Sequence, residues 1–272
     1  MIKNNPYLSV DENTLAREYI EKGYFVGEIK EKETISWIRK SLINIAKEEL
    51  NIKKAVSEDN FLDSIHEHLT VSQLNNFRLA MIRRMNLLPE FRQNYYKVIK
   101  PYLDIIVGNE ISMQLKANLS IQLPDDDSSL LPIHADTWSG DSPFEVVAWI
   151  PLVDCYKTKS MYILPANKYP VIEKNFKKMP DANTDDLFSS VEEDLKWLEI
   201  KYGEVLIFNQ ALPHGNRVNL ENESRWSMNC RFKGLHTPYW DKKLGEYFMP
   251  ITVKSCTRLG MNYEHPTNWL IE

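Results

Sequence analysis

Short strand-like runs separated by turn residues fill most of the chain after Ile111, and this pattern constrains the fold more than any other feature. Five runs are rich in β-branched and aromatic residues: "ISMQLKANLSIQLP", "FEVVAWIPLV", "SMYILP", "EVLIFNQ" and "RWSMNCRFKG". A parallel α/β sheet needs helices between successive strands, whereas a sandwich does not. Strands of this length at irregular intervals therefore predict a jelly roll or a related sandwich.

The first hundred residues carry helical signals instead. Four apolar side chains at helical spacing, opposite a charged face, mark a helix within residues 32–50: Ile35, Ile38, Leu42 and Ile45. Further helices are expected at 11–23, from Thr70 to about Arg84, and at 90–106, with a short strand at 24–29. We expect these helices to pack on the β core.

A single domain is expected over residues 1–272 because the chain shows no internal repeat and no obvious linker. Its parts are a mainly helical segment 1–110, a jelly-roll core 111–235 and a C-terminal extension 236–272. A polar, acid-rich insert at 168–200 interrupts the core and is long enough for a lid or a substrate loop. The predicted fold class is therefore mainly β with α.

Composition and charge exclude several classes of partner. The chain has 33 basic and 38 acidic residues, mixed along its length, so it lacks the basic stripe that follows a phosphate backbone. Its first residues lack the apolar region of a secretory signal, and no stretch approaches the ~20 apolar residues of a membrane span. We expect a soluble cytoplasmic protein that binds neither nucleic acid nor membrane. Three widely spaced cysteines predict reduced thiols.

A histidine and an aspartate stand one residue apart in "LPIHADTW" and form a candidate metal pair. On a strand, residues i and i+2 point to the same face, so His134 and Asp136 can reach one point in space. His214, which follows the apolar strand Val205 to Phe208, is the candidate third ligand. Two histidines and one carboxylate with open positions suit ferrous iron and dioxygen, whereas a closed zinc site needs a fourth ligand. The alternative is that His214 is a solvated loop residue.

The strand "SRWSMNCRF" carries a polar face as regular as its apolar face. Four polar residues alternate with apolar ones: Arg225, Ser227, Asn229 and Arg231. An arginine can clamp a carboxylate with two hydrogen bonds, and a neighbouring serine can add another. This face suits the far end of a dicarboxylate such as 2-oxoglutarate. The alternative is an edge strand with a solvated face.

These motifs together resemble a known family. His134-x-Asp136, His214 after "GEVLIF", and an Arg-x-Ser pair eleven residues beyond that histidine resemble the double-stranded β-helix oxygenases that depend on Fe(II) and 2-oxoglutarate. The branch most resembled is the phytanoyl-CoA hydroxylase-like group. Within it, "NLSIQLPDDDSSLLPIHADTWSGDSPFEVVAWIPLVDCYKTKSMYILP" is similar to oxygenases of bacterial carbohydrate-biosynthesis clusters. The likeness spans roughly residues 111–235.

The resemblance implies a cupin-like jelly-roll core and a set of site residues. It implies that His134, Asp136 and His214 bind Fe(II). It also implies that Arg225 and Ser227 hold the distal carboxylate of 2-oxoglutarate. Asn118 and Gln122 could donate hydrogen bonds to the cosubstrate, and Trp149 could form a wall of its pocket. Enzymes of this kind use O2 to oxidise a C–H bond and release succinate and CO2. Related halogenases lack the carboxylate ligand, so the presence of Asp136 favours hydroxylation.

Further residues are candidates for contacts with substrate. Arg217 and Arg231 could bind an anionic group, and Trp138 lies two residues after Asp136. His66 and His68 repeat the i, i+2 spacing and are either a rival metal pair or part of the substrate pocket, unless they only form a polar connector.

The predicted function is oxidation of a sugar, nucleotide sugar or sugar-derived small molecule by an Fe(II)- and 2-oxoglutarate-dependent dioxygenase. Two alternatives remain open at this stage. One is an oxygenase that acts on an amino acid or another specialised-metabolite precursor, and the other is a cupin-like metal-binding protein or isomerase without 2-oxoglutarate. The sequence does not decide between a monomer and a homo-oligomer.

Overall fold

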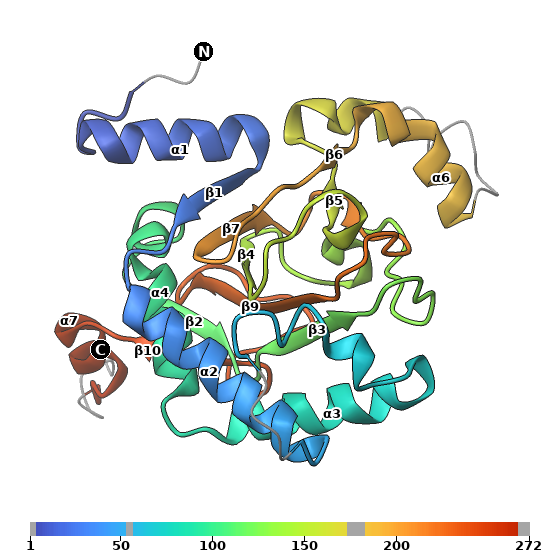
Figure 1. The fold of residues 1–272 in the computed structure, drawn as a ribbon. Helices are drawn as coiled ribbons and strands as arrows, with labels where there is room; N and C mark the ends of the chain where they lie inside the picture. The colour runs from blue at the N-terminus through green and yellow to red at the C-terminus, as the bar shows by residue number, and fades with distance from the viewer. Residues whose placement is uncertain (1–3, 53–56, 173–182, 266–272) are drawn as a thin grey trace, which may run out of the picture.

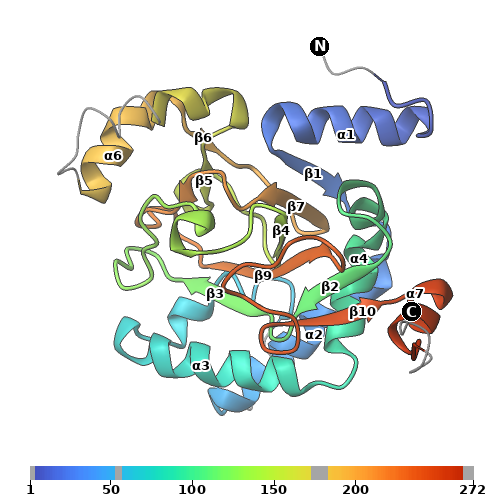
Figure 2. The same ribbon diagram turned by 180° about the vertical axis from the view of Figure 1, so that it is seen from behind.

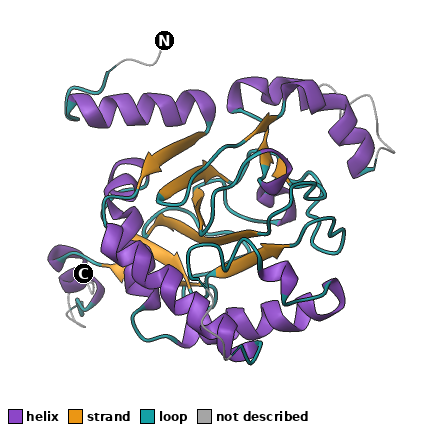
Figure 3. Ribbon diagram, in the orientation of Figure 1, coloured by secondary structure: helices purple, strands orange, loops and turns teal. Residues whose placement is uncertain are grey.

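The computed structural model describes residues 4–52, 57–172 and 183–265. Figure 3 shows the strands gathered in the middle of the molecule with helices around them. In chain order the main elements are α1 (Val10–Lys22), β1 (Tyr24–Glu28), α2 (Lys32–Glu49), α3 (Val71–Leu87), α4 (Phe91–Ile106), β2 (Ile111–Gln114), β3 (Asn118–Gln122), β4 (Glu145–Pro151), β5 (Tyr162–Ile163), α6 (Thr184–Val191), β6 (Lys196–Trp197), β7 (Glu204–Asn209), β8 (His214–Gly215), β9 (Arg225–Gly234), β10 (Phe248–Thr252) and α7 (Ser255–Met261).

The strands form two antiparallel sheets. The larger has seven strands in the order β1-β7-β4-β9-β2-β10, with β3 also paired to β9. The smaller has three strands in the order β6-β5-β8. Antiparallel pairing agrees with the expectation from strand spacing. The chain is nevertheless mixed α and β and not mainly β, because α2, α3 and α4 have 16 to 18 residues each, whereas the longest strand has ten.

Helices α2, α3 and α4 cover one side of the large sheet, and α6 lies on the other side beside the small sheet (Figure 1). The apolar face of β9 meets these helices. Phe77 of α3 packs edge-on against Trp226 with ring centroids 6.0 Å apart, and Tyr95 of α4 stacks on Phe232 at 6.3 Å. Because side chains alternate along a strand, the polar face of β9 is turned away from the helices and toward the small sheet.

The large sheet draws strands from both ends of the chain. In the N-terminal part, β1 pairs with β7, and in the C-terminal extension, β10 pairs with β2. Figure 2 shows β10 beside β2 and close to α7. The sheet therefore reaches beyond the 111–235 limits that the sequence predicts for the core. The first predicted run is also split in two, because Asn86 of α3 binds both backbone groups of Ala117 between β2 and β3, at 2.9 Å each.

The 168–200 insert is described in part, since residues 173–182 lie outside the described ranges. Its helix α6 begins at the N-cap Asn183, whose side chain accepts hydrogen bonds from the backbone of Asp185 and Asp186. Leu187 and Phe188 of α6 pack with Tyr162 of β5 in a second small apolar cluster. Among the described helices, none is both long and apolar enough to cross a membrane.

Candidate metal centre and the adjoining pocket

Three predicted ligands converge on one point. The nearest ligand atoms of His134, Asp136 and His214 all lie within 4.8 Å of one another. An isolated β-bridge joins the two histidines, whose backbone N–H groups donate to each other's carbonyls at 3.0 and 2.8 Å. Their ring centroids are 4.4 Å apart. The bridge thus places residues that are far apart in the sequence side by side.

Each imidazole is oriented by a backbone carbonyl. The Nδ1 atom of His134 lies 2.8 Å from the carbonyl of Pro132, and that of His214 lies 2.8 Å from the carbonyl of Leu212. A carbonyl only accepts hydrogen bonds, so each Nδ1 carries a proton and Nε2 is the ring atom left to bind a metal. Burial lowers the pKa of His214 to about 4, so this ring is neutral near pH 7, which is the form that binds metals.

The two oxygens of the buried Asp136 carboxylate have different surroundings. Oδ1 lies 3.6 Å from Nε2 of His134 and faces the centre. Oδ2 forms an ion pair with Nη2 of Arg231 at 3.0 Å. The backbone N–H of Asp136 donates to the carbonyl of Gln210 at 3.0 Å. The carboxylate is thereby fixed with one oxygen toward the histidines.

Arg231 is held from several sides. Its Nε donates to Oε1 of Gln210 at 3.0 Å, its Nη1 to the hydroxyl of Tyr247 at 2.9 Å, and Oδ2 of Asp141 lies 3.6 Å from Nη2. Burial alone would lower the pKa of Arg231, but the carboxylates of Asp136 and Asp141 offset it and leave the pKa raised. The expectation that Arg231 binds a substrate anion does not fit this placement, because two carboxylates of the chain already engage the guanidinium.

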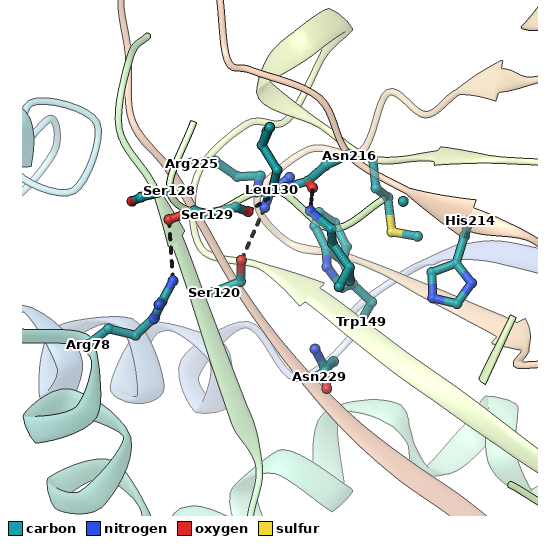
Figure 4. A pocket seen from close by; sticks show the side chains of 13 residues that line it. Arg78, Ser120, Ser128, Ser129, Leu130, Trp149, His214, Asn216, Arg225 and Asn229 are labelled. Carbon is teal, nitrogen blue, oxygen red and sulfur yellow. Dashed lines mark hydrogen bonds between the residues drawn. The ribbon is translucent and has the colours of Figure 1, made fainter. Parts of the chain in front are cut away.

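A cavity of about 290 Å³ adjoins the centre. Figure 4 shows His214, Trp149, Arg225 and Asn229 around it, with Arg78 at one side. Among the described residues that line it, none is acidic. A pocket with two arginines and no carboxylate favours an anionic ligand.

Arg225 carries the buried charge of this pocket. It is 4% exposed, and burial lowers the pKa of its guanidinium. Nη1 donates to the carbonyl of Ser160 and Nη2 to the hydroxyl of Ser120, each at 3.0 Å, while Nε has no partner within the described structure. No described carboxylate lies within ion-pairing distance. Burying an unpaired cation is costly, so this position suits a bound anion.

The other predicted cosubstrate residues lie close to Arg225. Ser227 follows on the same face of β9, and its buried hydroxyl has no hydrogen-bond partner within the described structure. Trp149 lines the cavity. The side-chain amides of Asn118 and Gln122 are bound within the chain, to Oδ1 of Asn229 at 3.0 Å and to the carbonyl of Arg217 at 2.7 Å.

None of the five predicted substrate residues, Arg231 included, is among those that line the cavity. Nδ1 of His66 lies 2.9 Å from the hydroxyl of Ser224, and His68 stacks on a phenylalanine. Trp138 is 41% exposed. Arg217 pairs with Asp185 of α6 at 2.8 Å, which ties the insert to the segment after His214.

Comparisons with solved structures identify the fold. No protein-family model and no curated protein matches this sequence. The non-haem monooxygenase ThoJ, in a nickel complex, superimposes with a TM-score of 0.59 at 11% identity, covering 89% of this chain and 85% of that one. The non-haem alpha-ketoglutarate-dependent carbocyclase SnoK from nogalamycin biosynthesis gives 0.51 at 15% identity, covering 93% and 100%. The fold is that of non-haem oxygenases. EctD from S. alaskensis gives 0.52 at 14% identity, covering 88% and 81%.

Replacement of Gly215 by alanine should disturb the centre. A Cβ atom there would lie 2.5 Å from the hydroxyl of Tyr162 and 2.6 Å from the carbonyl oxygen of Leu131, which is backbone and cannot move alone. We expect a loss of about 1–3 kcal/mol in the free energy of unfolding, together with weaker metal binding because Gly215 adjoins His214. Thermal unfolding and metal titration measure both.

The matched control is Gly260→Ala in α7, where an added Cβ meets nothing within 4 Å. This variant should be unchanged or slightly more stable, since alanine favours helix over glycine. Equal behaviour of the two variants would show that the strand β8 tolerates a side chain.

Proposed function

We propose that this chain is an Fe(II)- and 2-oxoglutarate-dependent oxygenase of the phytanoyl-CoA hydroxylase-like group, with a double-stranded β-helix core. One observation carries the proposal. A single cavity connects His214, which converges with His134 and Asp136, to the buried Arg225, which has no anionic partner among the described residues. A site that binds a metal and the far carboxylate of a 2-oxo acid needs both features.

The donor set fits ferrous iron. His134, Asp136 and His214 would hold the metal through two neutral nitrogens and one carboxylate oxygen. A closed structural zinc site requires four protein ligands. Among the described residues, no fourth histidine, cysteine or acidic residue joins this cluster. Iron held in this way supplies the redox chemistry that couples the decarboxylation of 2-oxoglutarate by O2 to the oxidation of a C–H bond, with succinate and CO2 as co-products.

The cosubstrate would be oriented by the polar face of β9. Arg225 would bind its distal carboxylate, the unpartnered hydroxyl of Ser227 would add a hydrogen bond, and Trp149 would form a wall of the pocket. Asn118 and Gln122 could donate to the cosubstrate only if their side-chain amides gave up their present hydrogen bonds to Asn229 and to the carbonyl of Arg217.

We further propose a sugar, nucleotide sugar or sugar-derived molecule as substrate. The support for this part is the resemblance of residues 118–165 to oxygenases of carbohydrate-biosynthesis clusters. The presence of Asp136 supports hydroxylation, or oxidation that follows from it, over halogenation.

Anaerobic titration tests the cofactor chemistry. Fe(II) and then 2-oxoglutarate are added to the metal-free protein, and a weak visible charge-transfer band of the chelated 2-oxo acid is expected. The band should be absent from His214→Ala. Iron binding without a band in the unaltered protein would refute the oxygenase and favour a cupin-like metal protein that does not use 2-oxoglutarate.

A competition assay then tests the substrate class. Sugar nucleotides and amino acids are compared for their ability to stimulate succinate formation. Stimulation by amino acids alone would refute the carbohydrate substrate while leaving the reaction class intact.

A further inference from the structure

Arg78 of α3 is the second guanidinium of the cavity. It is half-buried and donates to the hydroxyl of Ser129 at 3.3 Å and to Oδ1 of Asn75 at 3.1 Å. Both acceptors are neutral, and no described carboxylate lies within ion-pairing distance of Arg78. Figure 4 shows this side chain reaching from α3 toward Ser129, on the same side of the cavity as Arg225 and Ser120.

The two arginines lie at different depths. Arg225 is buried, whereas Arg78 is half-buried and the lining next to its partner Ser129 includes the exposed Ser128. The cavity therefore has one buried cation and a second cation that is half-buried.

The loop beside Arg78 is tied down without it. Nδ2 of Asn216 donates to the carbonyl of Ser129 at 3.3 Å, and Oδ1 of Asn216 accepts from the backbone of Leu131. Asp126 holds both the backbone and the hydroxyl of Ser128, at 2.8 and 2.6 Å. These contacts hold the loop without the charge of Arg78.

The charge of Arg78 would not be neutralised by the cosubstrate. The two carboxyl groups of 2-oxoglutarate would be taken by the metal and by Arg225, so the cosubstrate does not neutralise Arg78. We infer that Arg78, with the hydroxyl of Ser129, forms a subsite for an oxyanion of the substrate, a carboxylate or a phosphate. This inference rests on the proposed function and narrows its substrate class to anionic molecules.

Calorimetry on the Fe(II)-loaded protein with saturating 2-oxoglutarate, under anaerobic conditions, tests the subsite. Three probes share one sugar ring: glucose 1-phosphate, glucuronate and glucose. We expect at least one anionic probe to bind about tenfold more tightly than glucose, and Arg78→Gln to remove this difference. The two anions distinguish a phosphate from a carboxylate. Arg78→Lys keeps the positive charge but loses the planar guanidinium, so it should retain part of the difference in affinity between the anionic probe and glucose.

Arg83→Gln is the matched control, because Arg83 is an exposed arginine on the same helix. It should leave all three affinities unchanged. Equal binding of the anions and glucose, loss of the difference in Arg83→Gln as well, or no binding of either anion at about 10 mM would overturn the subsite.

The cosubstrate gives a separate readout. Arg78→Gln should leave 2-oxoglutarate affinity unchanged, and a loss comparable to that of an Arg225 variant would place Arg78 in the cosubstrate site instead, which also overturns the inference. Failure of the proposed function looks different: the unaltered protein would then bind no 2-oxoglutarate, whatever the state of Arg78.

Discussion

Replacement of Arg225 by methionine is expected to weaken 2-oxoglutarate binding about a thousandfold, because truncation of a buried, hydrogen-bonded charge pair costs about 2–5 kcal/mol. Iron binding should be nearly unchanged, since Arg225 is not among the three clustered ligands. Calorimetric titration of the metal-loaded protein measures both affinities. The 2-oxoglutarate affinity of Arg225→Lys should fall between those of the unaltered protein and Arg225→Met, because lysine keeps the charge but not the paired N–H geometry.

The same substitution should leave the ligand-free protein as stable as before, or more stable. The guanidinium is buried with two neutral acceptors and without a carboxylate, so its removal relieves a desolvation cost that only a bound anion offsets. Excess 2-oxoglutarate should raise the unfolding temperature of the unaltered protein by mass action and have no effect on the variant. Thermal unfolding with and without 2-oxoglutarate shows both effects.

Two outcomes would contradict this role. Undiminished 2-oxoglutarate binding by Arg225→Met would show that the cosubstrate lies elsewhere. A large loss of stability in the ligand-free variant would show that Arg225 is a structural residue whose two hydrogen bonds support the fold. The exposed Arg83 again supplies a control, since Arg83→Met should change neither property.

The sequence predicts those features that local periodicity determines. The strand at 225–234 was predictable because its polar and apolar residues alternate strictly, and β9 spans these residues. The helix at 32–50 was predictable because its apolar residues share one face, and α2 covers Lys32–Glu49. The α2 pattern reflects which side of the helix is buried, whereas the β9 pattern separates the face that packs on the helices from a polar face on which Arg225 and Ser227 are buried as well.

Features that arise from contacts between distant segments were not predictable. The short strand expected at 24–29 is β1, but nothing in the sequence indicates that it pairs with β7, and β10 looks like an ordinary part of the C-terminal tail until it pairs with β2. Arg78 stands in a helix with no distinctive spacing, and only the packing of α3 against β3 brings it to the cavity. Tertiary packing also decides that Arg231 faces Asp136.

Arg231 leads to the second large expected effect. Arg231→Met should lower the free energy of unfolding of the metal-free protein by about 3 kcal/mol, because it leaves the buried carboxylate of Asp136 without a cation. Asp136 would lose its only ion pair with an arginine or lysine among the described residues, whereas Asp141 would keep Lys242. Chemical denaturation measures the change. A variant as stable as the unaltered protein would show that the ion pair between Arg231 and Asp136 contributes nothing to the free energy of unfolding.

Arg231→Lys separates charge from geometry. Lysine keeps the positive charge near the centre but cannot reach Asp136, Gln210 and Tyr247 together, as the guanidinium does. The Asp136 carboxylate would then be less firmly oriented toward the two histidines, and we expect about a tenfold loss in Fe(II) affinity. Full retention of iron affinity would mean that the backbone alone positions this carboxylate.

A double-mutant cycle tests whether Arg231 acts through Asp136. In an Asp136→Asn background the uncompensated negative charge is absent, so Arg231→Met should cost at least about 1 kcal/mol less than it does alone. Additive effects would assign the stabilisation to Asp141, Gln210 and Tyr247 instead. A coupling of the expected sign would identify Arg231 as the residue that holds one oxygen of Asp136 so that the other remains directed at the two histidines.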